Sequence, residues 1–526
     1  MASRKLPIGI QDFVSIRQDG YLYVDKTDLV HRLVNQGRSY FLSRPRRFGK
    51  SLLLSTIGAY MEGRRELFTG LALERLETDW PVHPVLRLDL NAERYDSKEA
   101  LEAILDSHLN NWESVYGSGK DSSLSRRFIG AIERAFKETG KRTVILIDEY
   151  DKPLLQTLDK PELHGEYKSI LKGFYGVLKS ADASLKFVIL SGVTKFSQVS
   201  VFSDLNHLID LTLHPDYATL CGITEDELLR DFKPELAALA EAQKLTEREC
   251  LEKTRLWYNG YKFHPAAEGV YNPFSTLNLL SRREFSAFWF ATGTPTFLVE
   301  LLKQSDYDLR ELEGCQLVED DFANYRAEAD QPLPVIYQSG YLTIKGYNPA
   351  RRLYTLGFPN AEVKYGFLHF LSPYYTQVGS AKTGAFIGAF ADEIEAGKPE
   401  EFLERLKAFF AGIPYELSDR TERHYQVVFY LVFKLLGQFV EAEVSSAKGR
   451  ADAVVSCRDF VYVFEFKLGG SAEEAIAQIE DRGYPLPYAA EGKTLFRIGV
   501  EFDAAQRNLG RWIIRRADAN ITKLDS

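Results

Sequence analysis

The amino-acid sequence predicts a multi-domain α/β protein whose first domain has three layers built on a mostly parallel sheet. Three observations support this fold class. The chain has 526 residues, more than one hydrophobic core usually organises, so two to four domains are expected. Between Gly37 and about Pro215, short apolar runs alternate with segments of helical period. From about residue 416 the order becomes long helix, strand, strand, helix, which indicates a separate C-terminal domain.

The first domain, residues 1–215, is expected to alternate strands with helices. Strands are predicted at 39–43, 84–90, 143–148, 186–192 and 208–213, and helices at 98–116, 122–139 and 165–180. Asp96 and Glu99 have the spacing of a capping box that would begin the first of these helices.

The middle of the chain reads differently. Residues 216–310 are predicted to form a helical lid or subdomain, in which Thr224/Glu227 and Thr246/Glu249 are capping boxes and "TPTFLVELLKQ" has a proline near its first turn. Residues 311–415 are mixed, with a solvated hairpin around 345–352, and no function is assigned to them. Residues 416–526 complete the predicted division into four parts.

Composition narrows the class of protein. Hydrophobic residues make up 45% and aromatic residues 13%, as in a packed globular chain. The four cysteines lie far apart, which favours reduced thiols over a zinc knuckle or a disulfide framework. No signal-peptide pattern and no run of about 20 apolar residues is present, so we expect a cytoplasmic protein without a membrane partner. With a net charge of -9, nucleic-acid binding would require a local basic groove.

The stretch "SRPRRFGKSLL" is a candidate phosphate cradle. It matches G-x-x-x-x-G-K-[ST] except that Arg44 replaces the first glycine and Pro45 restricts how the loop begins. Backbone N–H groups at a helix N-terminus suit phosphate oxygens, and arginine side chains can supplement them. An ordinary helix start after a glycine turn is the alternative. The candidate nucleotide contacts here are Arg46, Arg47, Phe48, Gly49, Lys50, Ser51 and Leu52.

A second apolar strand, "VILIDEYD", ends in two acids beside the expected position of the cradle. Asp148 is a candidate Mg²⁺ ligand together with the Ser51 hydroxyl, and Glu149 is a candidate for orienting or deprotonating a water. A solvated turn is the alternative interpretation of this pair. Thr194, just past another strand, is a candidate sensor of the γ-phosphate or a plain loop threonine.

An ordered series of short motifs resembles the prokaryotic AAA-ATPase-like family over about residues 5–300. These motifs are "LPIGIQDF", "YVDKT", "SRPRRFGKSLL", "LIDEYDKP", "GVTKFS", "FSDLN", "CGIT", "WYNGY" and "YNPFS". The resemblance implies a P-loop NTPase-like fold, ATP and Mg²⁺, and the family shares the arginine in place of the first glycine. Binding with or without hydrolysis would use the same residues, so both stay open.

The C-terminal block contains a second candidate site. In "GRADAVVSCRDFVYVFEFKL", Asp452 begins one strand, while Glu465 and Lys467 lie two residues apart on the next and therefore on one face. A buried carboxylate and ammonium are costly unless they are paired or bound to metal. A structural Glu–Lys ion pair and a site in which Asp452 and Glu465 bind Mg²⁺ are both consistent with the spacing.

The flanks of this block resemble the PD-(D/E)XK nuclease superfamily over about residues 416–515. The order is a helix with Glu422, a strand, a strand with Asp452, a strand with Glu465 and Lys467, and a helix with Gln478. Ala451 stands where the name pattern has proline. The resemblance implies an α/β restriction-endonuclease-like domain. It implies Asp452, Glu465 and Lys467 as the core triad and Glu422 and Gln478 as accessory residues.

Together these sites predict an ATP-binding protein in which ATP gates or positions a Mg²⁺-dependent nuclease, with DNA favoured over RNA. A nucleotide-dependent switch or scaffold that does not cut, and a motor that remodels protein partners, are the alternatives. A homo-oligomer is expected if an arginine is shared between subunits. No H-x-x-x-H spacing and no G-x-S-x-G elbow is present, which argues against a zinc hydrolase and a serine hydrolase. Trp257, Tyr258 and Tyr261 are predicted to form a buried aromatic cluster.

Overall fold

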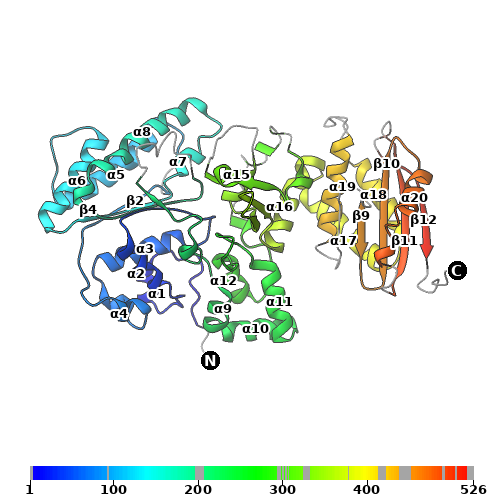
Figure 1. Ribbon diagram of the computed structural model, residues 1–526, viewed down its shortest axis with the longest axis horizontal. Helices are drawn as coiled ribbons and strands as arrows, with labels where there is room; N and C mark the ends of the chain where they lie inside the picture. The colour runs from blue at the N-terminus through cyan, green and yellow to red at the C-terminus, as the bar shows by residue number, and fades with distance from the viewer. Residues whose placement is uncertain are drawn as a thin grey trace. The chain divides into compact units, whose positions relative to one another are not determined.

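The computed structural model of the chain (Figure 1) consists of two compact units. One comprises Met1–Tyr307 and Glu311–Val363, and the other comprises Asp308–Arg310 and Lys364–Ser526. The structure describes residues 4–91, 94–195, 207–292, 298, 301–302, 305, 307–323, 332–376, 378–412, 422–437, 452–488, 492–503, 506 and 508–517. The four-part division at 215, 310 and 415 stays a prediction.

A five-stranded parallel sheet organises the first unit. Its spatial order is β2-β3-β4-β1-β5, with every neighbouring pair parallel. The bounds are β1 Ser39–Ser43, β2 Val85–Asp89, β3 Thr143–Asp148, β4 Leu185–Gly192 and β5 Ile209–Asp210. Each lies within or across one of the five predicted strands. β1 is buried along its whole length, as expected for a strand covered on both faces.

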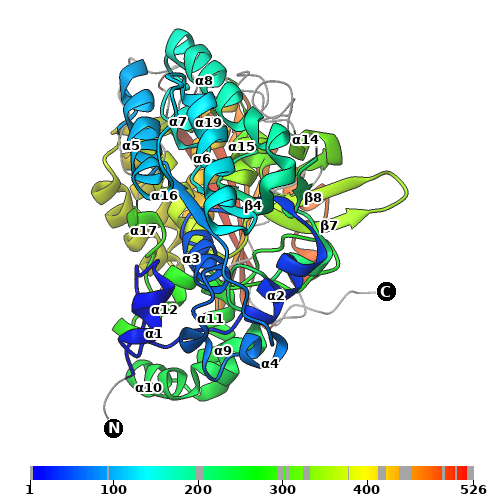
Figure 2. The same cartoon turned by 90° about the vertical axis from the view of Figure 1, so that its left-hand side faces the viewer.

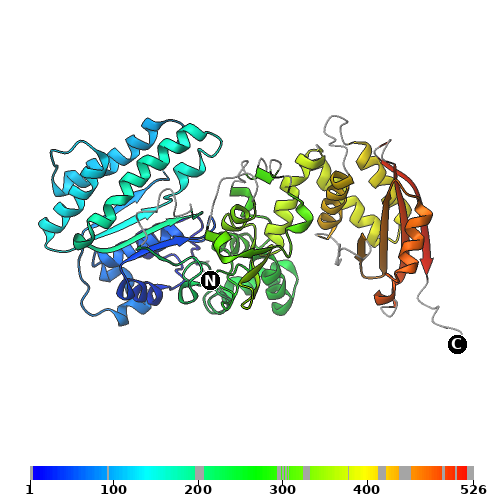
Figure 3. The same ribbon diagram turned by 45° about the horizontal axis from the view of Figure 1, so that its top comes forward.

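Helices cover both faces of this sheet (Figures 1 and 3). One face carries α5 Lys98–Tyr116, α6 Leu124–Thr139 and α8 Pro161–Ser180; the other carries α1 Phe13–Gln18, α2 Thr27–Gln36, α3 Lys50–Met61 and α4 Ala72–Leu76. The short α7, Lys152–Leu155, follows β3. The predicted Asp96–Glu99 capping box is wrong, because Ser97 is the N-cap of α5 and accepts the N–H of Ala100.

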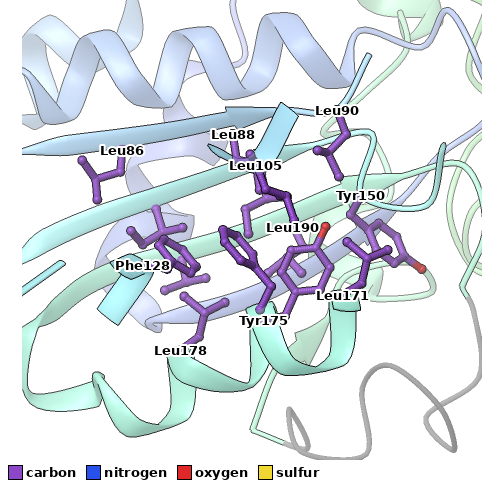
Figure 4. Close-up of a cluster of buried hydrophobic side chains, with 14 of the residues drawn as sticks. Leu86, Leu88, Leu90, Leu105, Phe128, Tyr150, Leu171, Tyr175, Leu178 and Leu190 are labelled. Carbon is purple, nitrogen blue, oxygen red and sulfur yellow. The ribbon is translucent and has the colours of Figure 1, made fainter. Parts of the chain in front are cut away.

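The main hydrophobic core lies between the sheet and the layer of α5, α6 and α8 (Figure 4). Leu86 and Leu88 of β2 face Leu105 of α5 and Phe128 of α6, all of them buried. Phe128 stacks on Phe174 of α8 with ring centroids 4.5 Å apart. Each fully buried side chain of this kind contributes about 1.5–3 kcal/mol, so the sheet is a firm base for the loops at its carboxyl edge.

A helical region follows, with its own core. It contains α9 Glu225–Asp231, α10 Lys233–Gln243, α11 Glu247–Tyr258 and α12 Pro273–Arg282. Both predicted capping boxes are confirmed, at Thr224/Glu227 and at Thr246/Glu249. Tyr258 and Tyr261 are buried as predicted, whereas Trp257 is half-buried. The segments "TPTFLVELLKQ" and "FSDLN" lie mostly or wholly outside the described residues.

The first unit ends with a small antiparallel sheet of order β6-β8-β7. The elements are β6 Gln316–Val318, α14 Glu319–Ala323, α15 Leu333–Gln338, β7 Thr343–Asn348 and β8 Leu353–Gly357. β7 and β8 form the predicted hairpin, which Figure 2 shows extending from the unit. Short 3-10 turns connect elements of the chain at Arg65–Phe68, Asp182–Ser184, Pro215–Tyr217, Phe290–Thr292, Leu309–Glu311 and Leu486–Tyr488.

The second unit has a four-stranded mixed sheet of order β12-β11-β10-β9. Its strands are β9 Ala453–Ser456, β10 Phe460–Leu468, β11 Thr494–Asp503 and β12 Asn508–Ala517. α20, Ala472–Asp481, packs on β10 and β11. The helices α17 Ser380–Glu395, α18 Pro399–Ala411 and α19 Glu422–Leu436 lie on the other face (Figure 3). α16, Ala361–Thr376, begins in the first unit and continues into the second. In the described part of the chain, no helix has both the length and the apolar character to cross a bilayer.

Candidate active sites

Arg44, at the position of the missing glycine, is a structural residue in the interior. Its backbone N–H donates to the Gly192 carbonyl at 3.2 Å, so the β1–β4 pairing extends through it as the following proline predicts. The side chain is 1% exposed, and its guanidinium donates to the carbonyls of Ser43, Thr212 and Tyr217 at 2.8–3.1 Å. This arginine therefore ties the end of β1 to the segment after β5.

The loop then turns into α3 through two left-handed residues. Arg47 has φ 66° and Gly49 has φ 89°, and α3 begins at Lys50. A Cβ at Gly49 would meet no atom within 4 Å, so the positive φ is the reason for glycine at this position. The first N–H groups of α3 consequently border a pocket, as in a phosphate cradle.

The pocket has a volume of about 730 Å³, which is in the range of ligand sites. Six of its lining residues come from the cradle: Arg46, Arg47, Gly49, Lys50, Ser51 and Leu52. Phe48 differs from the prediction, because its side chain is buried against Tyr261 and Phe263 with ring centroids 4.7 and 5.5 Å away. Phe48 therefore has only backbone atoms to offer a ligand.

Lys50 is held beneath the loop. Its ammonium donates to the carbonyls of Arg44 and Pro45 at 3.2 and 3.4 Å and lies 3.6 Å from Glu149 Oε1. The residue is 4% exposed, so this charge is desolvated and pre-positioned. Glu149 itself has φ 52°, an uncommon conformation for a residue with a side chain, which is frequent at functional sites.

Asp148 and Ser51, the two candidate Mg²⁺ ligands, lie near each other. The Ser191 hydroxyl donates to Asp148 Oδ1 at 2.5 Å, and the Ser51 hydroxyl is near enough to Asp148 to lower its pKa. Burial raises the pKa of Asp148, as does the Glu149 charge, and the two serine hydroxyls and Lys50 oppose the rise. The oxygens of Ser51 and Asp148 are of the hard type that Mg²⁺ prefers, so the donor set fits this ion.

Thr194 is occupied elsewhere. Its backbone N–H and its hydroxyl both donate to Asp151 Oδ2, at 2.6 and 2.7 Å, and the residue is fully buried. Asp151 also accepts the Val193 N–H at 3.0 Å. Asp151 therefore fixes the chain after β4, and a γ-phosphate contact of Thr194 stays a prediction that this geometry does not favour.

Trp289, Gly340 and Glu362 support the cradle loop. The Trp289 indole N–H donates to the Arg46 carbonyl at 3.1 Å, and the Trp289 backbone N–H donates to Glu362 Oε1 at 2.7 Å. Gly340, with φ 90°, lies so close to the loop that a Cβ there would be 2.6 Å from the Pro45 Cβ. Trp289, from the predicted lid, and Gly340, from the part to which the sequence assigned no function, thus hold the loop in place.

The second candidate site is in the C-terminal unit. Glu465 and Lys467 share one face of β10, and the Lys467 ammonium lies 3.4 Å from Glu465 Oε1. Gln478 of α20 joins them: its Oε1 accepts from Lys467, and its Nε2 donates to Glu465 Oε1. Asp452 Oδ2 accepts the Phe466 N–H at 2.8 Å, which places this carboxylate beside β10.

Glu465 has unused bonding capacity. It is 3% exposed, and its Oε2 has no hydrogen-bond partner in the described part of the structure. Burial raises the pKa of Glu465 to about 7, and the Asp452 charge adds to this, while Lys467 opposes it. An orphaned buried oxygen beside a second carboxylate fits a divalent cation such as Mg²⁺. Within the described ranges, no three His, Cys, Asp or Glu residues cluster as a metal site, so water would complete the coordination.

Two parts of this prediction lie outside the described residues. Glu422 is the first residue of α19, but its side chain is not among those described. Ala451 lies wholly outside the described residues.

Comparison with known proteins identifies both domains. The family model described as predicted AAA-ATPase matches residues 7–202. The PD-(D/E)XK nuclease superfamily model matches residues 420–512. A protein of Azotobacter chroococcum mcd 1, described as "Uncharacterized protein in vnfD 5'region", is 38% identical over 526 residues, covering 98% of this chain and 99% of that protein. No solved structure matches. The chain belongs to one family with this Azotobacter protein, and it contains an AAA-ATPase-like domain and a PD-(D/E)XK nuclease superfamily domain.

This AAA-ATPase-like protein combines an ATPase-type domain with a C-terminal PD-(D/E)XK nuclease domain, and so has ATPase and nuclease potential. The ATPase match contains the cradle, Asp148 and Glu149, and the nuclease match contains Asp452, Glu465, Lys467 and Gln478. Families of these types generally use a nucleotide and a divalent metal.

Three residues of the AAA-ATPase-like domain were missed by sequence reasoning. Ser191 was missed because its contact with Asp148 depends on β4 lying between β1 and β3, an order that the sequence does not state. Asp151 belongs to the quoted "VILIDEYD" run, but nothing in the sequence around it indicates that its carboxylate binds the backbone after β4. Lys152, which also borders the pocket, belongs to the quoted "LIDEYDKP" motif but was given no role.

Proposed function

We propose that this protein binds and hydrolyses ATP with Mg²⁺ at the cradle and that its C-terminal domain cleaves nucleic acid with Mg²⁺. We further propose that the nucleotide state gates or positions the cleavage. One observation carries the nuclease half: Glu465 is buried, joined to Lys467 and Gln478, and keeps one oxygen without a partner. The juxtaposition of Lys50, Ser51, Asp148 and Glu149 supports the ATPase half.

At the ATPase site, each residue has a stated task. The N–H groups at the start of α3 and Lys50 bind the phosphates, and Ser51 and Asp148 would hold Mg²⁺, which neutralises phosphate charge when bound. Glu149 orients the attacking water and accepts its proton. Because Lys50 and Glu149 are paired at 3.6 Å, nucleotide binding must divide Lys50 between Glu149 and the phosphates.

At the nuclease site, Asp452 and Glu465 would hold Mg²⁺, which lowers the pKa of a bound water and offsets phosphate charge. Lys467 positions the water or stabilises charge on the phosphate. Gln478 fixes the side chains of Lys467 and Glu465 relative to each other, because its amide accepts a hydrogen bond from Lys467 and donates one to Glu465. Lys467 and Glu465 also form the ion pair of the alternative, structural interpretation, at 3.4 Å, but that pair leaves Glu465 Oε2 without a hydrogen-bond partner in the described part of the structure.

DNA is proposed as the substrate in preference to RNA, and a homo-oligomer is proposed as the assembly. A nucleotide-dependent scaffold that binds without cutting remains the alternative function. It is favoured by the closed Glu465–Gln478–Lys467 network, which is complete on the Oε1 side without a metal.

The test uses wild type, Lys50→Ala, Lys467→Ala and the exposed control Lys398→Ala, each with Mg²⁺, with and without ATP. Substrates are plasmid, linear duplex, single-stranded DNA and RNA. We expect cleavage by wild type, a loss of about 100-fold or more in Lys467→Ala, and no change in Lys398→Ala.

Lys50→Ala should cut without responding to ATP. The gating would be refuted if wild type cleaves at the same rate with and without ATP and Lys50→Ala cleaves at that same rate. Binding of DNA without cleavage by any variant would favour the scaffold.

A further inference from the structure

The pocket of the ATPase domain contains a cation, the lysine of the "LIDEYDKP" motif, to which the sequence analysis gave no role. Arg46, Arg47 and Lys50 belong to the cradle, but Lys152 reaches the same pocket from α7, which follows the acidic end of β3. Lys152 is half-buried, and its backbone N–H donates to the Glu149 carbonyl at 3.0 Å. The lysine therefore lies one short turn from the residue proposed to activate water.

The Lys152 side chain is held in a defined place. Its ammonium donates to the backbone carbonyl of Asn91 at 2.5 Å and to the side-chain oxygen of Asn91 at 2.9 Å. Asn91 follows β2, borders the pocket, and is itself fixed by donating its backbone N–H to Asp89 Oδ1 at 2.8 Å. Both oxygens that hold Lys152 are uncharged, so these contacts orient the ammonium and leave its charge unneutralised.

The electrostatic surroundings agree with a position in the pocket. Burial lowers the pKa of Lys152, the Glu149 and Asp89 charges raise it, and Arg46 lowers it. Lys152 is thus within the field of both the cradle and the proposed base. Because Lys152, Glu149 and the cradle residues line one pocket, a nucleotide bound on the cradle would share that pocket with Lys152.

We propose that Lys152 is a second phosphate-binding cation, held by Asn91, that contacts the terminal phosphate of ATP within the same chain. The proposal rests on the proposed ATPase function. In hydrolysis a water oxygen bonds to the γ-phosphorus, the bond from that phosphorus to the bridging oxygen of ADP breaks, and Glu149 receives a water proton. Lys152 transfers no proton; it offsets the charge that develops on the phosphate oxygens, as an arginine from a partner subunit does in related enzymes.

The test measures ATP and ADP affinity by calorimetry, and steady-state ATP hydrolysis, in full-length wild type, Lys152→Ala, Lys152→Arg, Asn91→Ala and the exposed control Lys160→Ala. ADP lacks the phosphate that Lys152 is proposed to contact. We expect Lys152→Ala to keep ADP affinity within about twofold, to weaken ATP binding about tenfold, and to lower kcat about 100-fold. Lys152→Arg should recover part of the loss, Asn91→Ala should lie between, and Lys160→Ala should match wild type.

Equal weakening of ATP and ADP in Lys152→Ala, or an unchanged kcat, would overturn the proposal and make Lys152 a brace between β2 and α7. Failure of the ATPase function would look different. In that case wild type would bind neither nucleotide, or Lys50→Ala would bind both as wild type does, and the role of Lys152 would fall with it.

Discussion

At the scale of single residues, the two sites depend on charges that the fold has removed from water. Lys50 and Glu465 are almost fully buried, and Glu362 behind the cradle is 1% exposed. Such groups are costly unless they are paired, so each has a partner: Glu149 for Lys50, Gln478 and Lys467 for Glu465, and the Trp289 N–H for Glu362. These partners determine how each buried group is oriented and whether it carries a charge.

Glu465→Gln separates the metal-binding role of this residue from its structural role. Glutamine retains an oxygen that can accept from Gln478 but loses the charge that would attract a cation. We expect a folded protein whose nucleic-acid cleavage falls about 100-fold or more and whose Mg²⁺ binding, followed by calorimetry, is lost at the C-terminal site. Normal cleavage by Glu465→Gln would refute the triad.

Glu362→Gln gives a pH-dependent prediction. Burial raises the pKa of Glu362 to about 7, while the hydrogen bond from the Trp289 N–H opposes the rise. A carboxyl whose pKa is higher in the folded state stabilises the fold at low pH and loses that contribution as pH rises through about 7. Glutamine does not titrate, so the variant should gain on the order of 2 kcal/mol relative to wild type between pH 5 and pH 8.

Urea unfolding at both pH values measures this difference. Tyr258 and Tyr261 also face Glu362, but the pKa of each is raised by burial far above this pH range, so they stay neutral. A difference between variant and wild type that is the same at pH 5 and pH 8 would contradict the prediction.

At the scale of elements, the cradle is held by a segment distant in sequence. Gly340 packs closely against Pro45, and the Trp289 indole N–H donates a hydrogen bond to the Arg46 carbonyl. The sequence predicted the five strands, the two capping boxes of the helical region and the hairpin, because these follow from local apolar periodicity and turn chemistry. It did not predict the contacts of Gly340, Trp289 or Ser191, because those depend on strand order and on packing between segments hundreds of residues apart.

Gly340→Ala tests whether this support positions the phosphate loop. The added Cβ would lie 2.6 Å from the Pro45 Cβ, and φ at this position is 90°. Gly314→Ala is a matched control, because Gly314 has φ 88° but a Cβ there meets nothing within 4 Å. Both variants should lose about 1 kcal/mol or more in unfolding free energy from backbone strain.

ATP affinity should separate the two variants. We expect Gly340→Ala to bind ATP about tenfold more weakly, since the displaced loop carries the phosphate ligands, and Gly314→Ala to bind as wild type does. Calorimetric titration measures the difference. Equal ATP affinity in the two variants would mean that the contact with Pro45 stabilises the fold without positioning the loop.

At the scale of the whole molecule, the chain places an ATPase domain and a nuclease domain in two separate compact units. If the nucleotide gates the nuclease by changing how it binds nucleic acid, the two binding events must be coupled. Coupling between sites is reciprocal: the factor by which ATP changes the affinity for DNA equals the factor by which DNA changes the affinity for ATP. This equality distinguishes a gate from two independent activities that share a chain.

Asp452→Asn makes the coupling measurable, because removing one carboxylate should stop cleavage while leaving the DNA-binding surface in place. We expect ATP and a duplex of defined length to change each other's dissociation constant by the same factor, about 5-fold to 150-fold. Adding Lys50→Ala should reduce both factors to one, since the nucleotide then no longer engages the cradle. Two unchanged dissociation constants, together with wild-type cleavage that does not respond to ATP, would show that the nuclease domain works without reference to the nucleotide.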